Sequence, residues 1–399
     1  MKTSGWTWAA ALVAAWLLAG CGGGGTAAPA DAGGTDTATM SAQAALGRRI
    51  FDDVSLSASG RQACASCHSA DFGHAAPNAL AVQLGGPLLD QEGRRASPSI
   101  RYLSTNTAFH FDDEGTPTGG FFWDGRATSL QDQAARPFVS SFEMANASVQ
   151  EVIDKLSRAA YADEFKRVFG ADIFSRPDDA FDRMTLALQQ FQREDTALRA
   201  FSSKYDEFLR GKASLTEQEL RGLALFNRPD KGNCAACHPS AKAADGSHPL
   251  FTDFSYDNLG VPRNTELARN TEPNVFDLGL CAREGGDLVD RTDLCGAFKV
   301  PTLRNVALRQ AFFHNGRFKT LKDTLTFYVQ RDIHPEKFYP LDADGTVRKF
   351  DDLPPGFHAN VNTSEAPYDR KPGDAPALSD AEIDDVIAFL RTLTDGYQP

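Results

Sequence analysis

The chain has 399 residues, enough for two or three domains, and its 42% hydrophobic content can fill real cores, which excludes a disordered chain. Its formal net charge of −12 argues against a nucleic-acid-binding protein, because phosphate backbones require a basic surface. The acidity is compatible with a basic protein partner, although its ordinary consequence is solubility.

Residues 1–20 have the pattern of a bacterial lipoprotein signal peptide. Lys2 gives a short positive region, and Trp6–Ala19 is a mostly apolar run of 14 residues, short for a membrane-spanning helix. The run ends in L-A-G-C, which resembles a lipobox and implies cleavage before Cys21 and lipidation of its sulfur. Gly22 in place of Asp favours an outer-membrane anchor, so we expect membrane contact only through lipid. The alternative is an ordinary signal peptide with a chance cysteine.

Two copies of C-x-x-C-H organise the rest of the chain: C-A-S-C-H at Cys64–His68 and C-A-A-C-H at Cys234–His238. This spacing is typical of covalent c-type haem attachment, because each thiol can form a thioether with one haem vinyl group. The histidine that follows can supply the axial nitrogen of the iron. A redox C-x-x-C or half of a zinc site is the alternative for a single copy. The predicted thioether residues are Cys64, Cys67, Cys234 and Cys237, and the predicted iron ligands are His68 and His238.

Both motifs follow similar leaders with the pattern Gly-x-x-x-Phe, at Gly47–Phe51 and Gly222–Phe226. The shared pattern suggests duplicated haem-binding units about 170 residues apart. We therefore predict two cytochrome-c-like domains, 43–212 and 213–399, after a flexible Gly/Ala/Thr-rich tether over residues 21–42.

Helix signals outnumber strand signals, so the predicted class is mainly α with few short strands. Capping boxes at Thr216–Glu219 and Ser379–Glu382 predict helix starts. Apolar spacing predicts further helices over 148–169 and 178–210. The long loops expected from Gly and Pro content cover 71–120 and 239–300.

Two cysteines remain after these assignments. Cys281 and Cys295 are 14 residues apart, and export would place them in an oxidising compartment. A disulfide is the favoured interpretation, and closing this short loop would stabilise the fold by about 3 kcal/mol.

Three further motifs resemble those of the bacterial dihaem cytochrome c peroxidases and their relative MauG. They are F-F-W-D-G-R-A at Phe121–Ala127, F-E-M at Phe142–Met144, and F-K-V-P-T-L-R-N with F-F-H-N-G within Phe298–Gly316. The resemblance implies a peroxide-reacting first haem, a six-coordinate second haem and a tryptophan that carries oxidising equivalents between them. Trp123 matches that relay and is the only tryptophan outside the signal segment.

By the same resemblance, Glu143 takes the place of a distal acid–base carboxylate and Gln133 that of a distal amide. A carboxylate beside an open iron position can move the proton that peroxide cleavage requires. The family's distal histidine aligns within Leu84–Leu88, which holds no histidine, while His74 and His110 align poorly. We therefore expect the first haem to be open without reductive activation.

The sixth ligand of the second haem departs from the peroxidases as well. Their methionine aligns with Tyr328, and no methionine follows Met184. MauG uses a tyrosine there, and tyrosinate, a hard anionic donor, favours ferric iron. The alternative is that Tyr328 is only a core residue and that the sixth ligand is another side chain, such as His314, or is absent.

The family also holds calcium between its haems, bound by backbone carbonyls and an asparagine. The carbonyls align with Lys299 and Pro301, but the asparagine aligns with Ala96. Loss of a side-chain oxygen weakens a site for a hard cation, so calcium is left open.

Residues 328–340 and 276–281, with Cys295, look most like the MbnH branch, whose members oxidise a tryptophan of the partner MbnP. We therefore expect a periplasmic enzyme that uses hydrogen peroxide to form a high-valent dihaem state and oxidises a protein partner, such as an MbnP-like copper protein. The alternative is a peroxidase that reduces hydrogen peroxide with electrons from a small cytochrome or cupredoxin. A pure electron-transfer cytochrome is disfavoured, because it needs no open haem.

Overall fold

The computed structural model describes residues 40–399. The predicted signal peptide, the lipid site at Cys21 and nearly all of the predicted tether lie outside the described residues. No helix within residues 40–399 is both long enough and apolar enough to cross a bilayer.

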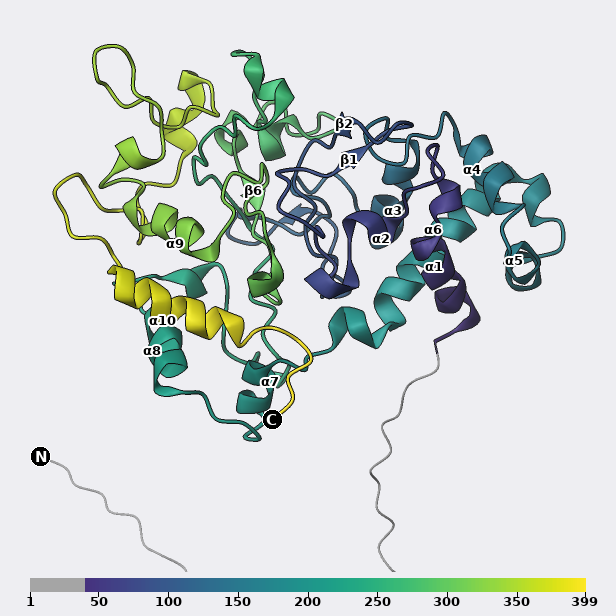
Figure 1. Cartoon of the computed structure of the whole chain (residues 1–399), viewed down its shortest axis with the longest axis horizontal. Helices are drawn as coiled ribbons and strands as arrows, with labels where there is room; N and C mark the ends of the chain where they lie inside the picture. Colours follow the sequence, from purple (N-terminus) through teal and green to yellow (C-terminus); the bar gives the residue numbers. More distant parts are fainter. Residues whose placement is uncertain (1–39) are drawn as a thin grey trace, which may run out of the picture. The chain divides into compact units, whose positions relative to one another are not determined.

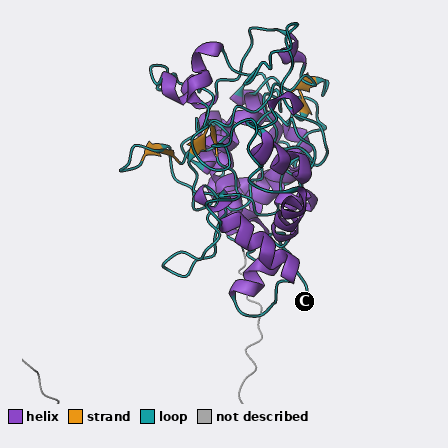
Figure 2. Ribbon diagram, turned by 90° about the vertical axis from the view of Figure 1, so that its left-hand side faces the viewer, coloured by secondary structure: helices purple, strands orange, loops and turns teal. Residues whose placement is uncertain are grey.

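Helices supply most of the regular structure, and the strands form short two-residue ladders between long loops (Figure 2). The helices are α1 Ala42–Asp52, α2 Cys64–Cys67, α3 Leu130–Val139, α4 Val149–Leu156, α5 Ala162–Phe169, α6 Pro177–Glu194, α7 Lys204–Leu209, α8 Glu217–Asn227, α9 Leu321–Gln330 and α10 Asp380–Arg391. The antiparallel pairs are β1 Leu84–Gly85 with β2 Gln91–Glu92, β3 His110–Phe111 with β4 Pro117–Thr118, and β5 Tyr256–Asp257 with β6 Phe298–Lys299. The prediction of a mainly helical protein with few short strands is confirmed.

The helix before each C-x-x-C-H motif packs across a helix from later in the chain: α1 packs on α6, and α8 packs on α10 (Figure 1). A Cβ on Gly47 would lie 2.0 Å from the Ala187 carbonyl oxygen of α6. A Cβ on Gly222 would lie 2.0 Å from the Asp385 carbonyl oxygen of α10. Only glycine permits such close backbone approach, so the glycine of each leader is where its helix crosses the partner helix.

Two hydrophobic cores follow the two helix pairs. The first is built from buried side chains between Leu46 and Leu198, and the second from buried side chains between Tyr205 and Leu393. Both cores belong to one compact unit, residues 40–399. Separable haem domains divided near residue 212 stay a prediction.

The two capping boxes form as predicted at the starts of α8 and α10. The helices predicted over 148–169 and 178–210, however, are each interrupted. In the second stretch α6 ends at Glu194 because the Asp195 carboxylate accepts a hydrogen bond from the Ala197 backbone N–H. A short side chain of this kind competes with the helical ladder, and Ser203 then caps a new helix, α7.

A second internal repeat precedes α3 and α9: F-F-W-D-G-R-A-T-S-L at Phe121–Leu130 and F-F-H-N-G-R-F-K-T-L at Phe312–Leu321. In each copy the first and seventh residues form an isolated β-bridge. The second phenylalanine of each has a positive φ, 65° and 64°. Aligned through this turn, Tyr328 of α9 corresponds to Pro137 of α3.

A disulfide joins Cys281 to Cys295. Both residues are buried in a small cluster of their own with Leu280, Leu288 and Leu294. The disulfide thus lies outside both main cores.

Candidate functional site

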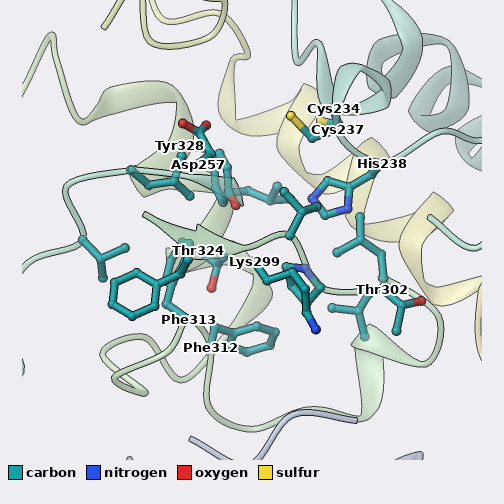
Figure 3. A pocket seen from close by; sticks show the side chains of 18 of the residues that line it. Cys234, Cys237, His238, Asp257, Lys299, Thr302, Phe312, Phe313, Thr324 and Tyr328 are labelled. Carbon is teal, nitrogen blue, oxygen red and sulfur yellow. The ribbon is translucent and has the colours of Figure 1, made fainter. Parts of the chain in front are cut away.

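A single cavity brings together the second C-x-x-C-H motif and the residue predicted to oppose it (Figure 3). Cys234, Cys237 and His238 line it, and so does Tyr328, which α9 contributes. Trp123, which is more than 100 residues earlier in the chain, also lines this cavity. The walls are otherwise largely apolar, as a porphyrin requires.

The imidazole of His238 has the tautomer and the neutral form that binding a metal requires. Its Nδ1 lies 2.8 Å from the Phe251 carbonyl oxygen, which can only accept, so Nδ1 carries the proton. Burial lowers the pKa of His238, which keeps the imidazole neutral. The Nε2 lone pair is therefore free for iron, with the backbone carbonyl fixing the tautomer.

His68 of the first motif is oriented in the same way. Its Nδ1 lies 3.2 Å from the His74 carbonyl oxygen and 3.1 Å from that of Pro98. Burial also lowers the pKa of His68. The His74 imidazole accepts a hydrogen bond from Arg101 Nε at 3.1 Å, and His110 is exposed on β3. An open first haem stays a prediction.

The four thiols are free and are not activated. Burial raises the pKa of Cys64, Cys234 and Cys237 to about 12 and that of Cys67 to about 11. A reactive redox pair has a lowered thiol pKa, so these pairs do not resemble a redox C-x-x-C. At both motifs two unreactive thiols lie beside an oriented histidine, and at the second motif they also line the apolar cavity, an arrangement that fits a haem.

Tyr328 reaches the cavity from α9 and stacks on Phe313, with ring centroids 5.6 Å apart. Burial raises the pKa of Tyr328, and the nearby Cys237 and Asp257 raise it further. The phenol is therefore neutral by itself. It would lose its proton only when a cation such as ferric iron binds its oxygen. Its role as a ligand stays a prediction.

His314, the alternative ligand, also lines the cavity. It stacks on Phe298 at 3.5 Å between centroids, and burial lowers its pKa to about 3. In the internal repeat His314 corresponds to Trp123, while Tyr328 lies two helical turns into α9.

Glu143 lies against the segment where the family's distal histidine aligned. A Cβ on Gly85 would lie 2.3 Å from the Phe142 carbonyl oxygen and 2.7 Å from the Glu143 Cα. Burial raises the pKa of Glu143, and its charge in turn raises the pKa of Cys67 and Cys64. The carboxylate is thus close to the first C-x-x-C-H motif.

Gln133 belongs to α3, and in the internal repeat it corresponds to Thr324 of α9. Thr324 lines the second cavity one turn before Tyr328. The correspondence supports a distal position for Gln133 at the first motif.

Trp123 is 8% exposed and held at both ends. Its Nε1–H donates to the Ala96 carbonyl oxygen at 2.8 Å, and its own carbonyl accepts from the Lys299 backbone N–H at 2.8 Å. Next to it, Arg95 forms ion pairs at 2.7 Å with both Asp124 and Asp277. These contacts fix the indole beside the second cavity.

The residues aligned with the calcium ligands fit that ion poorly. Ala96 has no side-chain oxygen, and its carbonyl already accepts from Trp123. The Lys299 ammonium donates to the Gly120 carbonyl oxygen at 2.6 Å, which adds a positive charge to the region. Calcium binding at this position therefore stays open.

Several polar residues around the second cavity carry no recognisable sequence signal. Asp257, from β5, lies beside Tyr328 (Figure 3), and Tyr368 has its ring centroid 5.9 Å from that of Tyr328. Arg309 lines the same cavity. Loop residues of this kind have no periodicity that could have revealed them.

Two oriented histidines with paired thiols define a haem protein with two sites. The model of the di-haem cytochrome c peroxidase family matches residues 41–214. The Methylamine utilization protein MauG of Paracoccus denitrificans is 34% identical over 374 residues, covering 90% of each chain. A cytochrome c551 peroxidase of Nitrosomonas europaea is 34% identical over 71% of each chain.

Solved structures agree. The diheme peroxidase BthA of Burkholderia thailandensis superposes with a TM-score of 0.81 at 39% identity, over 88% of this chain and 86% of that one. A MauG-like protein associated with microbial copper homeostasis superposes with a TM-score of 0.62 at 26% identity, over 89% and 90%. The chain belongs to the dihaem cytochrome c peroxidase and MauG family, and it is an oxidoreductase of the peroxidase type.

Proposed function

We propose that this enzyme uses hydrogen peroxide to oxidise a protein partner, with the oxidising equivalents passing through Trp123. The observation that carries the proposal is that Tyr328, rather than a methionine, lines the cavity of the second haem site. The haems, attached through the four thiols, would supply the iron that reacts with peroxide and holds oxidising equivalents. Hydrogen peroxide takes up two electrons and two protons to give two waters, and the partner supplies both electrons.

Glu143 is the proton carrier in this proposal. Burial raises its pKa, so this carboxyl takes up a proton more readily than an exposed glutamate does. Transfer of a proton between the two peroxide oxygens requires a group that can both take up and release one. Gln133 would orient peroxide by its amide.

Trp123 is the electron relay. Its Nε1–H donates to a backbone carbonyl, which is too weak a base to take the proton. Trp123 can therefore pass an electron while keeping its proton. A relay of this kind suits a partner too large to enter the cavity.

The partner's identity is a separate proposal. The copper-homeostasis relative supports an MbnP-like copper protein with an oxidisable tryptophan, although the identity to BthA is higher, 39% against 26%. Covalent c-type attachment and lipid anchoring at Cys21 would place the enzyme in the periplasm, on the outer membrane.

The second candidate is a peroxidase that draws electrons from a small cytochrome or cupredoxin. The similarity to the Nitrosomonas cytochrome c551 peroxidase favours it. The two functions differ in whether a reduced carrier protein sustains turnover.

Electron paramagnetic resonance of the resting dihaem protein tests the open first site. We expect one high-spin and one low-spin ferric signal, and two low-spin signals would contradict the proposal.

A second experiment distinguishes the two candidate functions. Peroxide is added with an MbnP-like protein, or with a reduced small cytochrome, and products are followed by mass spectrometry and absorbance. A partner tryptophan that has lost two electrons and gained an oxygen from water, and the loss of this product in Trp123→Phe, would support partner oxidation. Fast cytochrome turnover without that product would support the second candidate.

A further inference from the structure

Arg309 is a partly buried cation without an anion. Its Nη1 donates to the Ser97 carbonyl oxygen at 3.4 Å and its Nη2 to the Ala311 carbonyl oxygen at 3.1 Å. No carboxylate within residues 40–399 forms an ion pair or a hydrogen bond with it. Burial lowers the pKa of Arg309 to about 10, with no nearby anion to oppose it.

Two arginines with fully buried side chains are compensated by carboxylates. Arg304 pairs with Asp206 at 2.9 Å and Arg331 with Asp332 at 2.7 Å. Burying an uncompensated charge costs free energy, so a fold that pairs those two would gain by pairing Arg309 as well. An arginine has five N–H groups, and only two of them have partners here, which leaves a free donor pair for a carboxylate.

The position of Arg309 identifies where such an anion would lie. Its side chain lines the cavity of Cys234, His238 and Tyr328. Its charge also lowers the pKa of His68, and it bonds to Ser97, next to the Pro98 carbonyl that orients His68. Arg309 therefore stands between the second cavity and the histidine of the first site.

We propose that Arg309 binds a propionate carboxylate of the haem in the second cavity. A haem brings two carboxylates into a cavity whose walls are largely apolar. Two cations on that wall, Lys299 and Arg309, form no ion pair with a carboxylate among residues 40–399. The Lys299 ammonium donates to the Gly120 carbonyl oxygen at 2.6 Å, whereas the two-pronged guanidinium of Arg309 matches the geometry of a carboxylate. The guanidinium would then help to hold the haem in this cavity. The inference requires only that the cavity holds a haem and is independent of the enzyme's substrate.

The test compares dihaem protein carrying Arg309→Gln, Arg309→Lys or, as a control for loss of one positive charge, Arg348→Gln. Arg348 is exposed and has only a long ion pair, 3.9 Å, with Asp342. The readouts are the reduction potential of the low-spin haem between pH 5 and 9 and the propionate bending band in resonance Raman spectra.

In Arg309→Gln the potential should fall at high pH, because a positive charge beside the haem has gone. The fall should shrink as pH drops, because the unpaired propionate has a raised pKa and takes up a proton. Arg309→Lys should keep the wild-type pH profile but shift the Raman band, since an ammonium replaces the two-pronged guanidinium. Arg348→Gln should match wild type in both.

Wild-type potentials and an unmoved band in both Arg309 variants would overturn the proposal and leave Arg309 as a ligand of backbone carbonyls. Should Arg309→Gln not assemble as a dihaem protein, the Raman band of Arg309→Lys decides alone. A shifted band supports the pairing, and an unchanged band overturns it.

Discussion

The two haem sites share one framework, which is a helix crossing together with a backbone carbonyl that orients the C-x-x-C-H histidine. They differ on the side opposite the histidine. In both, a leader glycine allows two helices to cross in backbone contact, and a backbone carbonyl orients the C-x-x-C-H histidine. The turn before α3 also matches the turn before α9. At corresponding positions, however, α9 presents Tyr328 and α3 has Pro137, which has no donor atom for a metal.

The comparison shows how a duplicated frame can acquire two functions. The helix crossing and the histidine orientation depend on backbone contacts, which a repeat preserves. The distal group depends on single side chains, which can change without disturbing the fold. In the function proposed above, Glu143 serves proton transfer at the first site and Tyr328 offers a ligand at the second.

The largest expected effect comes from Tyr328→Phe, which would remove the donor that distinguishes the second site. The low-spin ferric signal should be lost and the potential of that haem should rise, because an anionic ligand has gone. Peroxide should still react at the first site. Tyr368→Phe, a neighbouring tyrosine, is the control and should keep the low-spin signal in electron paramagnetic resonance. A wild-type low-spin spectrum and wild-type partner oxidation in Tyr328→Phe would remove Tyr328 from the ligand set.

Glu143→Gln removes the carboxylate that distinguishes the first site from the second. The reaction with peroxide should slow by about 10²-fold or more, the usual scale for loss of an acid–base group, while both resting spin signals persist. Stopped-flow absorbance measures the rate. Glu114→Gln, in the exposed β3–β4 turn, is the matched control. Equal rates for wild type and Glu143→Gln would exclude the carboxylate from proton transfer.

Replacing Cys281 and Cys295 together by serine tests the disulfide, which lies outside both helix crossings and both main cores. Loss of this 14-residue closure should lower the free energy of unfolding by about 3 kcal/mol, because the unfolded chain gains freedom. Calorimetry measures the change. Both spin signals should be unaffected, and loss of one of them would tie the disulfide to a haem site.

Gly47→Ala and Gly222→Ala test whether the two frames are equivalent. Each added Cβ would meet a carbonyl oxygen at 2.0 Å, so each should destabilise the protein by about 1–3 kcal/mol through helix displacement. Gly356→Ala is the control, since a Cβ there meets nothing within 4 Å. Thermal unfolding compares the three. Destabilisation at only one crossing would show that the other crossing tolerates a wider helix spacing.

The sequence alone was sufficient for features that depend on neighbours along the chain. The C-x-x-C-H spacing identified Cys64–His68 and Cys234–His238, and the capping boxes located the starts of α8 and α10. Helix periodicity also indicated the fold class. It overestimated the continuity of 178–210, because the side chain of Asp195 competes with the backbone within one turn.

Only the tertiary structure decided which distant residues meet. Trp123 reaches the cavity of His238 because its indole N–H and its carbonyl are held by Ala96 and by Lys299, which is 176 residues further along the chain. Arg309 lies in the loop between the short 3-10 helix Val306–Leu308 and α9, and in the sequence it resembles any solvated arginine. Its lack of a carboxylate partner becomes visible only when the surrounding residues are in place, because burial and pairing are properties of the packed chain rather than of a local pattern.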